Sequence, residues 1–241
     1  MRWAGVLVIA AFAVVFAGQG SAAPDPTAEA DAILAHAKAA SGGGAWDRLQ
    51  GWHERGVIVR RDGQVDYEAW IDMRDLAIVN TRTADGATVV HGSDGRASWI
   101  IDPAGGVRFD TTSNGLAASR RNAYFSIFGY FFPKRFAAQR VYVGPQVSGG
   151  VTYDVVRVTP ADGSPMELWI DRATHRIGAL VDPDKAHPMI ALLSDYRPVG
   201  GVMVPFTVAT SFGGPRAAIV QHIGAYDFGP PDPSRFTPPQ P

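Results

Sequence analysis

Tight-turn dipeptides recur along the chain and divide most of it into short segments rich in β-branched and aromatic residues. They are Asp-Gly at 62–63, 85–86, 94–95 and 162–163, and Gly-Gly at 105–106, 149–150, 200–201 and 213–214. Glycine supplies the positive φ angle that two-residue hairpin loops require. Segments joined by such short loops pair with their neighbours in sequence. The pattern therefore predicts an antiparallel meander from about residue 54 onward.

Apolar and polar residues alternate within these segments, most clearly in residues 65–72 and 202–212. In the second segment Val204, Phe206 and Val208 share one face, which we assign to the inside. One buried face and one wetter face are typical of antiparallel sheets. We expect about 10–11 strands, and a sheet of that size curls rather than staying flat. The fold class is mainly β (α+β), with the meander curled into an unclosed barrel.

Two helices are expected outside the strands, both covering the concave side of the sheet. The first runs from about residue 28 to 40 with Thr27 as its N-cap. Its apolar stripe consists of Ala30, Ile33, Leu34 and Ala37. The second begins near Thr112, Ser113 or Asn114 and runs to about residue 129, before Pro133.

The second helix leads into residues 124–132, which hold six aromatic side chains. One interpretation is a core plug that fills the concave side, and the other is a lining or lid for an apolar cavity. The adjacent Arg120-Arg121 pair is either ion-paired with acidic residues or in contact with an anionic headgroup. On the cavity interpretation, the candidate ligand-binding residues are Arg120, Tyr124, Phe125, Phe128, Phe131 and Phe132.

The N-terminus reads as a secretory signal peptide over residues 1–22, with Arg2, an apolar run and small residues before the expected cleavage. No cysteine is present to carry a lipid anchor, so we expect a soluble, periplasmic protein. Residues 23–241 are predicted to form a single domain. Its proline-rich tail, 229–241, is expected to lie extended along a sheet edge or to be partly free.

Several functions are disfavoured by composition and spacing. The formal net charge of −1 offers no basic surface for nucleic acid. Beyond residue 22, no apolar stretch approaches the roughly 20 residues of a membrane span. The six histidines do not fall at metal-site spacing, so neither a metal nor a cofactor is expected. Asp110-Thr111-Thr112 lacks the glycine of an aspartic protease loop, and we do not expect an enzyme.

Residues 195–211, DYRPVGGVMVPFTVATS, resemble a near-final hairpin of the periplasmic lipoprotein-carrier superfamily (LolA/LolB-like). MELWID at 166–171 with its Asp-x-x-Thr turn, the opening at 42–56 and the closing phrase at 236–239 fit the same pattern. The resemblance implies an unclosed β-barrel whose apolar concave side, covered by helices, binds acyl chains.

Three functions remain open at this stage. The first is a carrier or chaperone whose partner is a lipoprotein or another acyl lipid. The second is a non-catalytic envelope interaction module with a filled core and a protein partner. The third, an enzyme on the same scaffold, requires a polar cleft with a catalytic constellation. An apolar cavity beside residues 113–132 would favour the first.

Overall fold

The computed structural model describes residues 25–161, 163–183, 189–212 and 218–240. In these residues, 13 strands form one antiparallel sheet in the order β6-β5-β4-β3-β2-β1-β13-β12-β11-β10-β9-β8-β7. The strands are β1 (Gly51–Arg60), β2 (Gly63–Asp72), β3 (Ala77–Ala84), β4 (Ala87–Ser93), β5 (Ser98–Ile101), β6 (Val107–Asp110), β7 (Ala138–Ser148), β8 (Val151–Pro160), β9 (Met166–Asp171), β10 (Ile177–Val181), β11 (Ile190–Val199), β12 (Val202–Ser211) and β13 (Ile219–Phe228).

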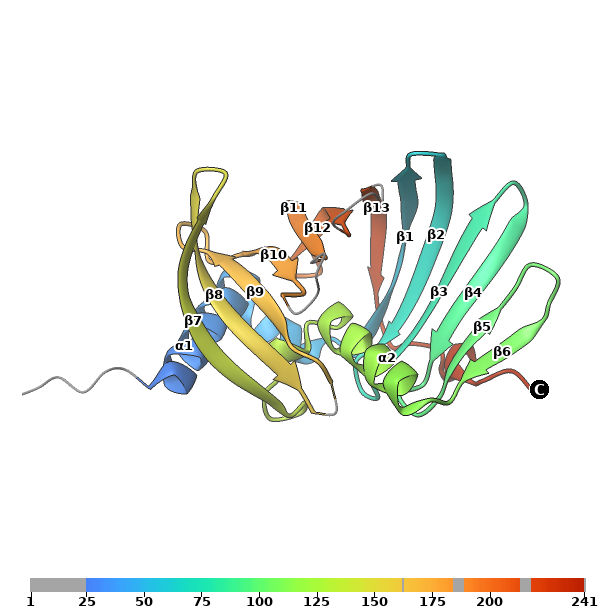
Figure 1. The fold of residues 1–241 in the computed structure, drawn as a ribbon, viewed down its shortest axis with the longest axis horizontal. Helices are drawn as coiled ribbons and strands as arrows, with labels where there is room; N and C mark the ends of the chain where they lie inside the picture. Colours follow the sequence, from blue (N-terminus) through green and yellow to red (C-terminus); the bar gives the residue numbers. More distant parts are fainter. Residues whose placement is uncertain (1–24, 162, 184–188, 213–217, 241) are drawn as a thin grey trace, which may run out of the picture.

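The predicted fold class is confirmed: the sheet is a meander curled into an unclosed barrel (Figure 1). The expected strand number was too low, partly because β5 and β6 are only four residues each. The edge strands β6 and β7 are consecutive in sequence, whereas β1 and β13 pair in the middle of the sheet. Helix α2 (Ser113–Ser126) connects the two edges and lies between the two ends of the curled sheet (Figure 1).

Helix α1 (Pro26–Ala40) covers one half of the concave face. Its predicted apolar stripe is confirmed, since Ala30, Leu34 and Ala37 are buried. The Asp31 carboxylate pairs with the Arg140 guanidinium of β7 at 2.9 Å. The N-cap is Asp25 rather than Thr27, because the Asp25 carboxylate accepts from the Thr27 backbone N–H. The helix therefore begins two residues earlier than predicted.

The second helix ends earlier than predicted, at Ser126 instead of about residue 129. Thr112 is its N-cap, and its hydroxyl accepts from the Gly115 N–H at 3.1 Å. Phe128 has a φ angle of 56°, which breaks the helix, and a 3₁₀ turn follows at Gly129–Phe131. A side chain at Gly129 would lie 2.7 Å from the Tyr124 ring, so only glycine allows the chain to turn here.

The C-terminal segment packs on the convex face instead of along a sheet edge. Pro233–Phe236 forms a 3₁₀ turn that buries Phe236 against Ala77, Val79 and Trp99. The Arg235 guanidinium lies 4.2 Å from the Trp70 ring centroid. The predicted signal peptide, residues 1–22, lies outside the described residues. Among those described, no helix has both the length and the apolar character needed to cross a membrane.

Candidate functional site

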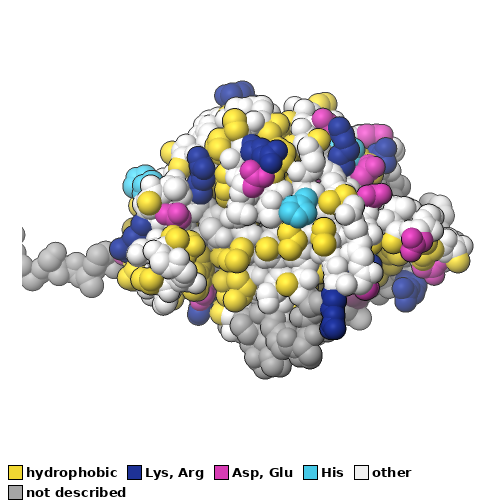
Figure 2. All heavy atoms as spheres, turned by 90° about the horizontal axis from the view of Figure 1, so that it is seen from above, with side chains coloured by type: hydrophobic (Ala, Val, Ile, Leu, Met, Phe, Trp, Pro, Cys, Tyr) yellow, Lys and Arg dark blue, Asp and Glu magenta, His cyan; other side chains and the backbone are white. Residues whose placement is uncertain are grey.

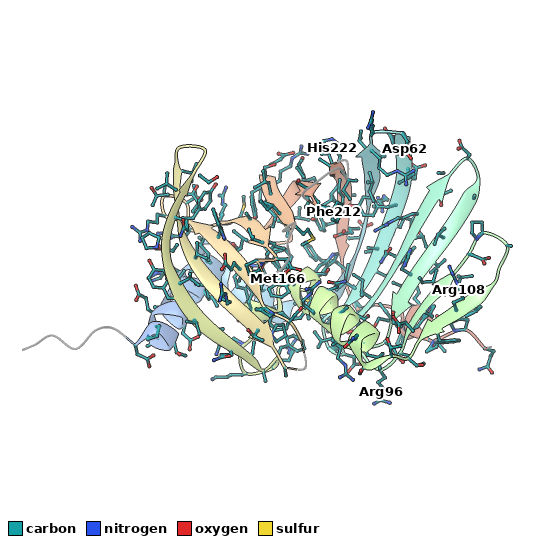
Figure 3. The ribbon with its side chains drawn as sticks, viewed as in Figure 1. Asp62, Arg96, Arg108, Met166, Phe212 and His222 are labelled. Carbon is teal, nitrogen blue, oxygen red and sulfur yellow. The ribbon has the colours of Figure 1, made fainter. Side chains whose placement is uncertain are left out.

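A cavity of about 270 Å³ lies where α2 and the following aromatic turn face the concave side of the sheet. Met166 of β9, labelled in Figure 3, borders it from one half of the sheet. The lining is mostly apolar: Trp52, Ile71, Ile78, Phe125, Phe128, Tyr130, Met166, Leu180, Met189, Leu193, Pro205, Val208, Ile223 and Tyr226. The polar members are Glu54, Asn122, Ser126 and Gln221. Mostly apolar walls with few polar groups are typical of a small-molecule site.

The structure separates the six candidate residues into two groups. Phe125 and Phe128 line the cavity. Tyr124, Phe131 and Phe132 are buried elsewhere in the aromatic core. Phe131 packs edge-on to Trp46 at 5.5 Å, and the Lys38 ammonium of α1 lies 4.7 Å from the Phe132 ring centroid.

The early end of α2 accounts for this division. Beyond Ser126 the aromatic residues no longer follow helical spacing, so their directions could not be inferred from a continued helix. Tyr130 was not among the six candidate ligand-binding residues. It lines the cavity because the turn at Phe128 and Gly129 directs its side chain there. Gly129 followed by Pro133 was the available sequence signal for an early helix end.

The two arginines of α2 make protein contacts. Arg121 pairs with the buried Asp182 carboxylate at 3.2 Å and donates to the Ser164 hydroxyl at 2.7 Å. Arg120 donates from Nε to the Gly95 carbonyl at 3.1 Å, and it does not belong to the cavity lining. A contact between Arg120 and a ligand headgroup therefore stays a prediction. The position of Arg120 outside the cavity lining does not support it.

Glu54 of β1 places a carboxyl group inside the apolar cavity. It accepts from the Trp52 indole N–H at 3.0 Å and from the Gln221 amide at 3.4 Å. Burial raises the pKa of Glu54 to about 7, against an ordinary value of 4.5. Burial together with the Glu54 charge raises the pKa of the neighbouring Tyr67 hydroxyl. Glu54 was not predicted as a site residue. The available signal was its position on the same strand face as the apolar residues Trp52 and Ile58, which indicates the buried side of the sheet.

A second, polar cleft of about 380 Å³ adjoins this cavity and shares Ile78, Asn122 and Ser126 with it. Its other lining residues are Asn80, Arg82, His91, Gly92, Ser93, Ser98, Asp110, Gly115, Ala118 and Ser119. No hydrogen bond in the described part of the chain joins His91 to a hydroxyl or carboxylate, so no nucleophile–base pair is formed there. The described residues also contain no group of three or more acidic, His or Cys side chains able to hold a metal.

The surface around these spaces is mixed in character. Figure 2 shows hydrophobic side chains along the middle of the face seen from above, with charged side chains grouped around them. Among the large apolar side chains, Val147 of β7 and Leu192 of β11 have the highest exposed fractions, 71% and 51%. Neither of them lines the apolar cavity or the polar cleft.

Comparisons with known proteins identify the fold. No family model and no curated protein sequence matches the chain. A LolA superfamily protein from Nitrosomonas europaea superposes with a TM-score of 0.61 at 13% identity, over 86% of this chain and 97% of that one. A DUF1329 family protein from Desulfovibrio piger gives 0.59 at 13% identity, over 85% and 94%.

A domain from Vibrio parahaemolyticus, described as belonging to an outer membrane lipoprotein-sorting protein, gives a TM-score of 0.57 at 12% identity. The match covers 84% of this chain and 93% of that domain. Each of the three similarities covers at least 84% of this chain. The chain therefore has the LolA/LolB-like fold.

Proposed function

We propose that this protein is a carrier that holds the acyl chain of a lipoprotein, or another apolar lipid, in the cavity beside Phe125 and Phe128. The observation that carries the proposal is the cavity of about 270 Å³ with predominantly apolar walls. Empty apolar space is costly inside a protein, because its walls lose packing contacts. Binding of an apolar ligand would fill the cavity and offset this cost, which accounts for the presence of the space.

The volume suits a slender ligand. Small-molecule sites span about 300–1,000 Å³, and this cavity of about 270 Å³ is slightly smaller than that range. It accepts one acyl chain or part of one more readily than a bulky ring system. The alternative function, an interaction module, requires a filled core, and the cavity disfavours it. An enzyme is disfavoured because the described residues of the polar cleft form no nucleophile–base pair.

The cellular setting belongs to the same proposal. The N-terminal segment has the pattern of a secretory signal, and no cysteine is available for lipid anchoring. A soluble protein in the periplasm would receive acyl cargo there and pass it to an envelope partner. The similar fold of the lipoprotein-sorting domain from Vibrio parahaemolyticus supports this assignment.

The experiment is a pair of truncations with the fluorescent fatty acid cis-parinaric acid as the probe. Phe128→Ala removes apolar wall from the cavity, so we expect affinity to fall about tenfold, or ~1.4 kcal/mol. Phe132→Ala removes a buried ring that faces α1, so we expect about 3–5 kcal/mol lost from the free energy of unfolding and unchanged affinity in the folded protein.

Titration fluorescence measures affinity, and urea denaturation measures stability. Mass spectrometry of the protein isolated from its native envelope identifies any lipid bound to it. If the wild type takes up no fatty acid and carries no lipid, the carrier assignment is wrong and the interaction module replaces it.

A further inference from the structure

We propose that the polar cleft beside the cavity binds the anionic headgroup of the cargo, with Arg82 as its main contact. The proposal rests on the proposed function and narrows it: the cargo is a single-chain amphiphile ending in a carboxylate or a phosphate. Its acyl chain occupies the apolar cavity, and its charged end occupies the cleft. We expect neutral lipids with the same acyl chain to bind with lower affinity.

The register of β3 connects the two spaces. Ile78, Asn80 and Arg82 alternate along β3, and all three line the polar cleft. Ile78 also lines the apolar cavity. Four residues of strand span about 13 Å, so an amphiphile with its chain at Ile78 reaches Arg82 with its head. The shared residues Asn122 and Ser126 on α2 form the opposite wall of this passage.

Arg82 is a cation without a carboxylate partner. Among the described residues it has no ion pair, and its side chain is exposed to the cleft. Desolvation and the nearby positive charge of Arg60 lower its pKa. Both effects disfavour the isolated cation, and the opposite charge of an incoming anion would offset them. The planar guanidinium matches carboxylate and phosphate oxygens with two parallel hydrogen bonds.

His91 and Asn80 face the same cleft, and they are directly paired in the β3–β4 register. Burial and the Arg82 charge lower the pKa of His91, which keeps the ring neutral with one N–H to donate. Within the described part of the chain, the buried Asn80 side-chain oxygen has no hydrogen-bond partner. This oxygen accepts hydrogen bonds, so among the proposed headgroups only a singly protonated phosphate, which keeps an O–H, can donate to it.

Two carboxyl groups lie near the proposed headgroup site. Asp110 accepts from both the backbone N–H and the hydroxyl of Thr112 at the start of α2, which lowers its pKa and keeps it engaged. Glu54 lies two strands away from Asn80, across Ala69 of β2, in the apolar cavity. Neither carboxyl pairs with Arg82, so the cation is available to a ligand.

The cleft stays open because α2 presents small residues to it. Gly115, Ala118 and Ser119 form the helical wall opposite Arg82. A side chain at Gly115 would lie 1.9 Å from the Asp110 carboxylate, so this position does not admit a larger residue without moving Asp110. The helix therefore leaves room for a headgroup in the cleft, which larger side chains at these positions would fill.

The test compares three ligands that share one chain: decanoate, decyl phosphate and decanol. Each displaces the neutral fluorescent probe N-phenyl-1-naphthylamine from the wild-type protein. We expect the anionic ligands to bind at least tenfold more tightly than decanol, and this preference to weaken at high salt. Decanoate and decyl phosphate distinguish a carboxylate site from a phosphate site.

Arg82→Gln should abolish the preference for anions, lowering the affinities for decanoate and decyl phosphate to that for decanol. Arg82→Lys should restore part of the preference, because it keeps the charge without the planar fork. Arg61→Gln is the matched control, since Arg61 is exposed outside both cavities and its replacement removes the same charge. Thermal midpoints verify that all variants are folded.

Equal affinity of the wild type for decanol and the anions overturns the headgroup site but leaves the carrier function standing. Equal losses for all three ligands in Arg82→Gln also overturn it, because they indicate a structural role. If the probe and all three ligands fail to bind, the carrier function itself is wrong, and the headgroup site falls with it.

Discussion

The two helices cover the same concave face in opposite ways. α1 presses an apolar stripe onto its half of the sheet, and Ala30 and Ala37 are fully buried. α2 buries only Ala123, Tyr124 and Phe125 near its C-terminal end. The rest of its sheet-facing side borders open space: Gly115, Ala118, Ser119, Asn122 and Ser126 line the cavity or the cleft.

The difference shows how one sheet can provide both stability and a site. Under α1, large side chains such as Trp46 fill the space to the density of a normal core. Under α2, small residues cannot span the gap between helix and strands. The aromatic turn at Phe128 separates the two regions, because its ring contacts Trp46 on one side and Trp52 on the other.

The largest expected effect is in the packed half. Trp46→Ala removes a side chain with 0% exposure whose indole N–H donates to the Ser41 carbonyl at 2.8 Å. We expect a loss of about 3–5 kcal/mol from the free energy of unfolding. Asn122→Ala in the open half should change it by less than about 0.5 kcal/mol. Urea denaturation measures both, and similar losses would mean that the two halves are equally packed.

A smaller effect is expected from enlarging matched alanines on the two helices. Ala37→Leu on α1 forces extra volume into filled core and should cost about 1–3 kcal/mol. Ala118→Leu on α2 extends into the cleft and should change stability by less than about 0.5 kcal/mol.

Binding should respond in the reverse order. Ala118→Leu is expected to weaken decanoate affinity because it occupies the cleft, whereas folded Ala37→Leu should bind normally. Denaturation and probe displacement on the same two proteins provide the measurements. A destabilised Ala118→Leu protein would mean that α2 is closely packed and that the cleft is not available space.

The hairpin meander and the α1 stripe were predictable because each depends on local sequence, namely turn dipeptides and helical periodicity. The end of α2 depends on how close Gly129 lies to the Tyr124 ring, which is a tertiary contact. The directions of the aromatic side chains beyond Ser126 follow from this early helix end. Phe236 belongs to the tail that was predicted to lie along a sheet edge or to be partly free. Its burial depends on its contacts with Trp99 and Val79 on the convex face, which are distant in sequence.

The cavity lining was only partly predictable. Phe125 and Phe128 stood out as part of an aromatic cluster, but Glu54 and Arg82 are single charged residues in strands. Such residues usually face solvent. Their positions on the concave face follow from strand register across β1, β2 and β3, where Glu54 is opposite Ala69 and Ala69 is opposite Asn80. The register across three strands depends on how separate segments pair, so it could not be predicted from the sequence of any one strand.

The smallest expected effect concerns Glu54, the carboxyl group in the open half. Its pKa is raised to about 7 by burial, so between about pH 4.5 and 7 the folded state binds a proton that the unfolded state has released. The free energy of unfolding therefore falls as pH rises through this window. Glu54→Gln cannot ionise and should be more stable than the wild type at pH 8 by about 1–2 kcal/mol, with little difference near pH 4.

Urea denaturation of both proteins across that pH range measures the difference. Asp66→Asn is the control, because it removes an exposed carboxylate from the neighbouring strand β2, outside both cavities. Its stability should follow the wild-type pH profile in this window. A Glu54→Gln profile parallel to that of the wild type would mean that water solvates the carboxylate fully. The cavity would then be a wide aqueous opening, and the contrast between a packed half and a sheltered, ligand-sized half would not hold.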